Sequence, residues 1–373
     1  MIRRLSDSGD DFIEWISFWR RTGHEPYAHP LYVGLFLGTG DEAQALLWKD
    51  QKTGAQVLLP LTRRPLPREE WAENAVSEYP WTDAISPYGY GGPFADSEQV
   101  NWNLFWTDVV DWMRTERVIT LFVRTSLQSR PPELLNGLEA GCYEVLQLSE
   151  NVIVDVHRSK ELQWDHYEHK VRKNVRKAER AGLRVEIHDR FNNLDTFLDI
   201  YHSTMQRRSA SDWYFFKRSF FQTFVDSFTG SYIVAEVYNN INEIVSVELI
   251  LKSDKFLYSY LGGTLKEAFI HAPNDLLKNA VIDYARAHGK DGYVLGGGYK
   301  PDDGIFRYKK AFDVDGVVPF FGIRLTASPK VYREMSDQRL AAARIQTPDV
   351  TLQAHFFPQY RAPLTSEVAL NSK

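Results

Sequence analysis

The sequence predicts an α+β fold of two similar domains, each a mixed sheet flanked by helices, and three observations favour it. The chain has 373 residues, more than one ordinary hydrophobic core accommodates. Hydrophobic residues make up 43% and charged residues 25%, as in soluble globular proteins. An order of strands, glycine-containing turn, helix and strand occurs twice along the chain, which is typical of α+β units.

The first copy of this order lies in the N-terminal half. Residues 44–49 and 55–61 are two strand candidates, and the glycine-rich segment SPYGYGGPF follows at 86–94. Apolar residues recur at helical spacing through 101–114. The apolar run 118–125 then predicts a buried strand.

The second copy is clearer. Turn residues separate three strands at 231–239, 244–252 and 255–263. A helix is predicted over 274–289, with Asn274 as its N-cap. The run 292–298 is a buried strand that ends in three glycines, and we expect an extended segment after it, without a helix.

A basic helix is predicted between the two copies. From His169 to Arg184 the chain holds seven Lys or Arg residues against one acid, while Val171, Val175 and Ala178 form a narrow apolar stripe. The cations, Lys173 and Arg176 among them, are either a solvated face or a platform for pyrophosphate or an RNA backbone.

Charge and composition restrict which partners, cellular locations and kinds of site are expected. A net charge of −5 argues against a globally basic nucleic-acid binder, so no DNA partner is expected. The single cysteine, the acidic N-terminal segment and the lack of a long apolar run favour a cytoplasmic protein without a transmembrane segment. His166 and His169 lie three residues apart without a cysteine or histidine cluster, so no metal site is expected. Neither a Walker phosphate loop nor a G-x-S-x-G elbow occurs.

Several segments together resemble the FemABX-like acyltransferases, which carry two GNAT-like domains and include enzymes that add amino acids from aminoacyl-tRNA to peptidoglycan precursors. The matching segments are SPYGYGGPF, KAERAGLRV, IYHSTMQRRSASDWYF, HAPNDLLKNAVIDYARAHG, and LGGG followed by FRYKKAF. The resemblance implies a first GNAT-like domain over 1–150 and a second over 151–335 that begins with the basic helix. The composition after Leu340, rich in Thr, Gln, Pro and Ala, predicts a C-terminal tail over 336–373 that either wraps the core in partly ordered form or is a free end.

The sequence departs from this family and from ordinary GNAT proteins at three points. The long helical hairpin of some members is missing, and Tyr308 stands where phenylalanine is usual. CoA-dependent GNAT proteins hold the pyrophosphate at a glycine turn before the central helix. No glycine lies between Gly263 and Gly289, so that turn is absent.

Site residues follow from the matching motifs. The resemblance implies that Lys309, preceded by the aromatic Tyr308, contacts substrate, that Arg207 binds substrate phosphate, and that Tyr214 and Tyr90 line the site. For each of these the alternative is an ordinary surface cation or half-buried ring. Two candidates for a general base follow from residue type and position, Glu248 and His271, and substrate-assisted proton transfer needs neither.

The sequence therefore predicts an N-acyltransferase without a permanently bound cofactor. Its donor is either aminoacyl-tRNA or acyl-CoA, and its acceptor is an amine of a nucleotide- or lipid-linked envelope precursor or a related metabolite. One alternative is an acetyl-CoA-dependent N-acetyltransferase that acts on an amino sugar in polysaccharide biosynthesis. The other is a non-catalytic protein that binds RNA or an envelope precursor.

Overall fold

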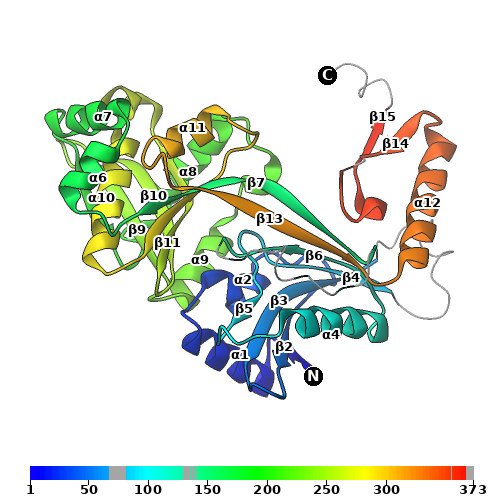
Figure 1. Cartoon of the computed structure of the whole chain (residues 1–373). Coiled ribbons are helices and arrows are strands. Elements are labelled where there is room, and N and C mark those ends of the chain that lie inside the picture. The colour runs from blue at the N-terminus through cyan, green and yellow to red at the C-terminus, as the bar shows by residue number, and fades with distance from the viewer. Residues whose placement is uncertain are drawn as a thin grey trace. The chain divides into compact units, whose positions relative to one another are not determined.

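The chain forms two compact units in a computed structural model that describes residues 1–66, 81–127, 129, 135, 138, 141–353 and 355–366 (Figure 1). Unit 1 takes the described residues of Met1–Thr22, Tyr27–Leu148 and Phe321–Lys373. Unit 2 takes Gly23–Pro26 and Ser149–Phe320. No helix in the described part of the chain is both long enough and apolar enough to cross a membrane.

Unit 1 is a sheet with the strand order β1-β2-β3-β4-β6-β13, in which β4 and β6 are parallel and the other neighbours antiparallel. Its core lies under helix α4, whose buried face includes Phe105, Trp106 and Val109. The elements are β1 (Ile2–Ser6), α1 (Gly9–Arg21), α2 (Pro30–Gly34), β2 (Glu42–Lys49), β3 (Gln56–Pro65), β4 (Thr82–Ile85), β5 (Phe94–Ala95), α4 (Trp102–Thr115), β6 (Val118–Arg124), α12 (Pro329–Gln346), β14 (Val350–Leu352) and β15 (Leu364–Ser366). Strands β7 (Tyr143–Asp155) and β13 (Val317–Thr326) contain residues of both units.

Unit 2 has the strand order β7-β12-β11-β10-β9-β8, with β11 and β12 parallel. Helices α7 and α10 pack against its core, where Val175, Leu277 and Val281 are fully buried. The elements are α6 (Lys160–His166), α7 (His169–Arg180), β8 (Arg184–His188), α8 (Leu194–Arg207), α9 (Arg218–Ser227), β9 (Tyr232–Tyr238), β10 (Ile244–Lys252), β11 (Phe256–Thr264), α10 (Pro273–Ala287), β12 (Gly292–Gly296) and α11 (Gly304–Lys310). Short 3₁₀ helices span Asp212–Tyr214 and Lys266–His271.

The two units share one arrangement: a helix connects two parallel strands. In unit 1 these are β4, α4 and β6, and in unit 2 they are β11, α10 and β12. The predicted α+β fold with mixed sheets flanked by helices is therefore confirmed, as is the repeated order of elements.

The range 336–373, predicted as a C-terminal tail, is ordered in its described part. Its described residues complete α12 and form the β14–β15 hairpin of unit 1, and Phe321 onwards also belongs to that unit. Tyr360 is fully buried and packs in a cluster with Met335 and Ile119. The Thr- and Pro-rich composition conceals these few apolar anchors, which are sufficient to order the segment.

Two local predictions in unit 2 are wrong. The glycine run is followed by helix α11, not by an extended segment, because the Asp303 side chain accepts a hydrogen bond from Phe306 N (2.7 Å) and so caps the helix. Helix α10 begins two residues earlier than a cap at Asn274 predicts: its first residue is Pro273 and its N-cap is Ala272. Proline suits a first helical position because its missing N–H has no partner there.

Candidate active site

The candidate active site lies in unit 2, where the parallel strands β11 and β12 stop pairing. Their pairing ends at Tyr258 and Val294, whereas β11 continues to Thr264 and β12 to Gly296. We call the part of these two strands beyond the last pair the strand fork. The carboxyl ends of parallel strands are a common place for ligand sites.

A buried network of four side chains stands at the base of the strand fork. Lys278 on α10 donates to Glu248 Oε1 on β10 (2.5 Å), to Ser259 Oγ on β11 (2.8 Å) and to Tyr293 Oη on β12 (3.0 Å). Ser259 and Tyr293 in turn donate to the same Oε1 (2.5 and 2.9 Å). Glu248 is 4% and Lys278 6% exposed, so this is an ion pair removed from solvent and bound by two hydroxyls.

The network bears on the role of Glu248, which the sequence predicts as a candidate general base. Its Oε1 accepts three hydrogen bonds, one of them from a lysine, so it is a paired carboxylate. Its Oε2 is buried and has no partner in the described part of the chain. Leaving such an oxygen unsatisfied is costly, and each case requires an explanation. Lys278 and Tyr293 are not among the site residues predicted from the sequence.

Lys309 lies on α11 and reaches back to the glycine run. Its Nζ donates to Gly297 O (2.7 Å). Burial, followed by the positive charge of Lys278, lowers the pKa of Lys309 to about 8. Tyr308, one residue earlier, accepts a hydrogen bond from Asn274 on α10 (3.0 Å). The predicted aromatic–lysine pair therefore sits against the helix that carries Lys278.

Glycine is required in this run for two reasons: one position has a left-handed backbone conformation, and at the others neighbouring atoms leave no room for a Cβ. Gly296 has φ +80°, in the left-handed region that favours glycine. A Cβ on Gly297 would lie 2.6 Å from Glu150 O, and one on Gly298 would lie 2.4 Å from Asp303 Oδ1. The run thus lets the chain pass β7 and reach the cap of α11, which places Lys309.

Arg207 ends α8 near the open end of the strand fork. Its guanidinium lies over the Phe269 ring (4.6 Å to the centroid), and its Nη2 donates to Thr204 Oγ1 (3.4 Å). Thr204 Oγ1 also accepts from Thr264 N, the last residue of β11 (3.1 Å). A stacked, half-buried arginine at this position suits an anionic group of a substrate.

The other predicted residues are less closely connected. Tyr214 ends a 3₁₀ helix and packs edge-on against Trp213, with ring centroids 4.9 Å apart. His271 is exposed at the end of Lys266–His271, and within the described residues no hydrogen bond or ion pair joins it to Glu248 or Lys309. Tyr90 belongs to unit 1, where it packs edge-on against Tyr27 at 5.2 Å. Burial raises the pKa of Tyr90.

The start of α10 carries a buried carboxylate. Asp275 is 6% exposed, lies in the first turn of the helix, and accepts a hydrogen bond from Asn174 Nδ2 on α7 (3.1 Å). Burial raises its pKa to about 6. A helix N-terminus attracts anions, and in this helix the chain's own side chain occupies that environment.

Helix α7 confirms the predicted stripe, because Val171, Val175 and Ala178 are fully buried. Its cations are not equivalent. Arg172 donates to backbone carbonyls of Trp164, Asp165 and Tyr167, and Arg176 stacks on the Trp164 ring at 5.2 Å. The structure, over the residues that it describes, records no ion pair or hydrogen bond for the exposed side chains of Lys173, Lys177 and Arg180.

One cluster outside the fork has metal-ligand residue types. Ligand atoms of His166, Asp313 and Asp315 lie within 4.8 Å of one another. Both oxygens of the fully buried Asp313 are engaged: Oδ1 with His166 Nε2 (2.9 Å), and Oδ2 with Arg158 Nη1 (2.5 Å) and Asp155 N (3.0 Å). We interpret the cluster as an ion-pair network that closes this corner of unit 2.

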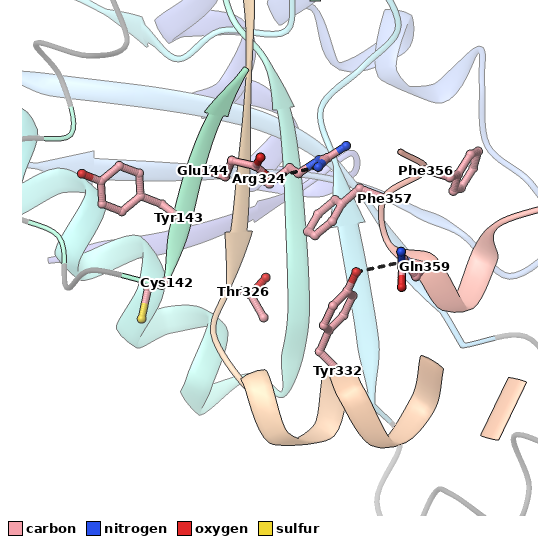
Figure 2. Close-up of a pocket in the computed structure, with 10 residues that line it drawn as sticks. Cys142, Tyr143, Glu144, Arg324, Thr326, Tyr332, Phe356, Phe357 and Gln359 are labelled. Carbon is pink, nitrogen blue, oxygen red and sulfur yellow. Dashed lines mark hydrogen bonds and ion pairs between the residues drawn. The ribbon is translucent and has the colours of Figure 1, made fainter. Parts of the chain in front are cut away.

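Unit 1 has a pocket of about 220 Å³ (Figure 2). Arg324 on β13 pairs with Glu144 (2.9 Å) and lies over the Phe357 ring at 5.3 Å. Tyr332 from α12 accepts a hydrogen bond from Gln359 N (3.3 Å), and Figure 2 shows its ring standing near that of Phe357. The residues that line this pocket include none of the predicted site residues, so the candidate site is assigned to the strand fork.

Known proteins share part of this sequence and the fold of the chain. Residues 166–310 match the family model of the acetyltransferase (GNAT) domain, a range that contains the whole buried network and Lys309. The chain is similar to the crystal structure of FemX, with 16% identity, a TM-score of 0.60, and 79% of this chain and 90% of FemX covered. It is also similar to L-PGS from Bacillus licheniformis, with 12% identity, a TM-score of 0.54, and 90% and 98% covered.

A conserved protein of unknown function from Bacteroides thetaiotaomicron VPI-5482 has the same fold, with 8% identity, a TM-score of 0.57, and 87% of this chain and 100% of that chain covered. A comparison with curated protein sequences finds no match. Residues 166–310 are similar to the acetyltransferase (GNAT) domain, and the chain has the fold of FemX. The predicted resemblance to FemABX-like tandem GNAT proteins and the predicted enzyme class, an acyltransferase, are confirmed.

Proposed function

We propose that the chain transfers an aminoacyl group from tRNA, or another acyl group, to an amine of a phosphate-bearing cell-envelope precursor or a related metabolite. The observation that carries the proposal is the position of Lys309. A lysine with a lowered pKa is held beside the strand fork of a GNAT domain, next to a buried ion pair. Titratable groups perturbed by burial and a specific charge partner gather at active sites.

The proposed reaction needs little from the protein beyond position and charge. The lone pair of the acceptor amine forms a bond to the carbonyl carbon, and the carbonyl π electrons move to oxygen. Collapse of this intermediate breaks the bond to the tRNA oxygen or CoA sulfur, which takes up a proton, while the nitrogen loses one. Lys309, when protonated, stabilises the oxyanion, and Arg207 holds a phosphate of the acceptor.

The start of α10 supports an aminoacyl-tRNA donor over a CoA thioester. An ordinary GNAT protein leaves this helix N-terminus open to the CoA pyrophosphate, whereas here the first turn contains buried Asp275 after the left-handed Ala272. A carboxylate at that place repels a pyrophosphate and occupies the favourable end of the helix dipole. The exposed cations Lys173, Lys177 and Arg180 of α7 are available to a polyanion such as tRNA.

The second candidate is an acetyl-CoA-dependent N-acetyltransferase that acts on an amino sugar. The observation in its favour is the match of 166–310 to an acetyltransferase domain. Calorimetry distinguishes the two donors. We expect a dissociation constant for acetyl-CoA above about 0.1 mM, equivalent to a binding free energy of only about 5–6 kcal/mol. A low-micromolar constant would promote this second candidate.

Binding of tRNA tests the role of α7. Lys173→Glu/Lys177→Glu removes two exposed cations and leaves Arg176 on Trp164. We expect weaker binding and a slope of log affinity against log salt that is smaller by about 2. The matched control is Lys330→Glu/Arg333→Glu on the exposed face of α12, which changes the net charge equally. Equal affinities of the two variants for tRNA would mean that the cations of α7 form a solvated face and do not bind tRNA.

A further inference from the structure

Unit 1 has its own pair of parallel strands, and a basic side chain stands at their carboxyl ends. Strands β4 and β6 pair as far as Ile85 and Phe122, and β6 continues to Arg124. Ser86, directly after β4, donates its N–H to Phe122 O (2.8 Å), and its Oγ accepts from Arg124 N (2.8 Å). The Ser86 side chain thus replaces the next main-chain partner, and the glycine-rich segment leaves the sheet there. Ligand sites are common at such strand ends.

The guanidinium of Arg124 has no counter-charge in the described part of the chain. The side chain is half-buried, and its guanidinium carbon lies 5.1 Å from the centroid of the Phe122 ring. Among the described residues, no side chain or carbonyl forms a hydrogen bond or ion pair with its N–H donors. Burial lowers the pKa of Arg124. The other groups that act on it are Tyr88, Arg64 and Tyr32, none of which is an acid. Because arginine stays protonated in proteins, this is a partly buried cation without an anion.

The acids on the same sheet face are already engaged by other arginines. Alternate residues of a strand share a face, so Thr120, Phe122 and Arg124 of β6 lie together. Thr120 Oγ1 lies 3.1 Å from Tyr360 Oη, which donates to Asp83 (3.1 Å). Arg324 stands opposite Phe122 on the neighbouring strand. The ion pairs of this face are Arg64 and Arg361 with Asp83, and Arg324 with Glu144. Neither acid therefore balances Arg124.

Aromatic rings support the arginines of this face. Arg124 lies over Phe122, and Arg324 lies over the Phe357 ring at 5.3 Å. The two rings are 6.3 Å apart, and Phe357 also lines the pocket of Figure 2. A guanidinium stacked on a ring has a fixed plane, and its N–H groups point outward along that plane. Such a fork matches the two oxygens of a carboxylate or phosphate.

The glycine-rich segment approaches Arg124 with its backbone alone. A Cβ on Gly91 would lie 2.5 Å from Ser86 Oγ and 3.3 Å from Arg124 O. Gly89 has φ +97°, and its Cβ would lie 2.3 Å from the Tyr27 ring. Any larger residue at these two positions would displace its neighbours, so glycine keeps the segment close to the strand end that carries the cation.

We propose that the carboxyl ends of β4 and β6 form an anion site of unit 1, in which the guanidinium of Arg124, stacked on Phe122, binds a carboxylate or phosphate group of a ligand. The missing counter-charge is the observation that carries this proposal. The site lies in unit 1 and uses none of the residues of the proposed transfer step, so it goes beyond the proposed function.

Modification by phenylglyoxal tests the site on the unaltered chain, because the reagent attacks arginines that are not shielded and peptide mass spectrometry follows each arginine separately. The probes are sodium phosphate and sodium acetate, each compared with sodium chloride at equal ionic strength. One arginine should bind such an anion with a dissociation constant of about 1–10 mM. At about 40 mM, the anion should therefore slow the modification of Arg124 about fivefold or more. Exposed Arg114, paired with Asp111, is the internal control, and its rate should not change.

The Arg124→Gln variant separates an anion site from a structural contact. In chloride it should unfold at the temperature of the parent or slightly above, because it removes a partly buried charge and leaves no partner behind. Phosphate or acetate should raise the unfolding temperature of the parent and of Arg114→Gln, but not that of Arg124→Gln. Each protein is compared with itself in chloride, so differences in stability do not affect this result.

Equal rates of Arg124 modification in phosphate, acetate and chloride would overturn the proposal. So would equal stabilisation of Arg124→Gln and the parent by the anions, or a clear loss of stability of Arg124→Gln in chloride, which would make Arg124 a structural residue of the sheet. Stronger protection by phosphate or by acetate identifies the group that the site prefers. None of these measurements involves acyl transfer, so they are independent of whether the proposed function is correct.

Discussion

In each unit a buried carboxylate lies near the pair of parallel strands, Asp83 in unit 1 and Glu248 in unit 2, and the two are neutralised differently. In unit 1, Asp83 on β4 is fully buried and receives bonds on both oxygens, from Arg64 (2.6 Å), Arg361 (2.6 Å) and Tyr360 (3.1 Å). In unit 2, Glu248 pairs with a single lysine, and its second oxygen has no partner in the described part of the chain.

The difference shows how one architecture can serve two purposes. Two of the groups around Asp83 belong to the C-terminal segment, so that carboxylate fastens the end of the chain to unit 1. The Glu248–Lys278 pair instead stands beside Lys309, whose pKa is lowered to about 8. Removing one partner of a buried, saturated ion pair destabilises a fold, whereas an incompletely satisfied pair beside a perturbed lysine is typical of a reactive site.

The largest effect is expected on the stability of unit 1. Asp83→Asn leaves Arg64 and Arg361 without their shared counter-charge, which should lower the free energy of unfolding by about 3–5 kcal/mol. Urea unfolding followed by circular dichroism measures this loss. Asp111→Asn, at an exposed acid that pairs with Arg114 three residues on, is the control and should cost less than about 1 kcal/mol. A reduced transfer rate per folded molecule in Asp83→Asn would show that unit 1 is also part of the chemistry.

The next effect is expected on the activity of unit 2. Lys309→Ala should keep the fold and reduce turnover by about 10²–10³, the usual cost of one lost oxyanion or phosphate contact. Lys310→Ala, one residue further on α11, should cost far less, because adjacent helical side chains point about 100° apart. A transfer assay with the true donor compares them. Equal activities would remove Lys309 from the site.

The fold could be predicted from the sequence, and Lys309 could be proposed as a site residue, because both rest on local patterns. Turn residues and apolar spacing predict strands and helices, and the aromatic–lysine pair can be recognised as a short motif. Lys278 was not predicted because its partner, Glu248, lies 30 residues earlier in the sequence and on another element. A local sequence pattern does not show such a pair. One signal was present: Glu248 interrupts the apolar strand IVSVELILK, and a buried acid needs a buried partner.

The C-terminal segment and α11 illustrate a second limit of sequence reasoning. A few anchors decide their structure, namely Tyr360 against Met335, and Asp303 as a helix cap. Neither segment has a strong periodic pattern of apolar residues. Their secondary structure is therefore determined by tertiary contacts, which the composition does not show. Both anchors therefore became visible only in the folded chain.

A smaller effect is expected from pH. The pKa of Lys309 is lowered to about 8, so the side chain is protonated below that pH and loses its charge as pH rises through it. If the cation stabilises the oxyanion, turnover should fall about tenfold between pH 7 and pH 9. Lys309→Arg, which stays charged, should abolish this fall. A rate that instead rises through about pH 8 would identify Lys309 as a base.

The smallest effect is expected at the glycine run that places Lys309. Gly297 does not have a positive φ, so a side chain there is opposed by close contact and not by the backbone conformation. Its added Cβ would lie 2.6 Å from Glu150 O, a backbone atom that cannot rotate away. Gly297→Ala must therefore shift the strand end by a few tenths of an ångström, at a cost of about 1–3 kcal/mol in stability.

That shift also moves Gly297 O, the acceptor of the Lys309 ammonium, so turnover should fall severalfold but less than about tenfold. The control is Gly304→Ala at the first position of α11, where an added Cβ meets nothing within 4 Å. Alanine is the better helix former, so this variant should match the parent or exceed its stability slightly. Similar turnover in both variants would mean that the position of Lys309 does not depend on the glycine run, and that the helix cap alone holds it beside the buried pair.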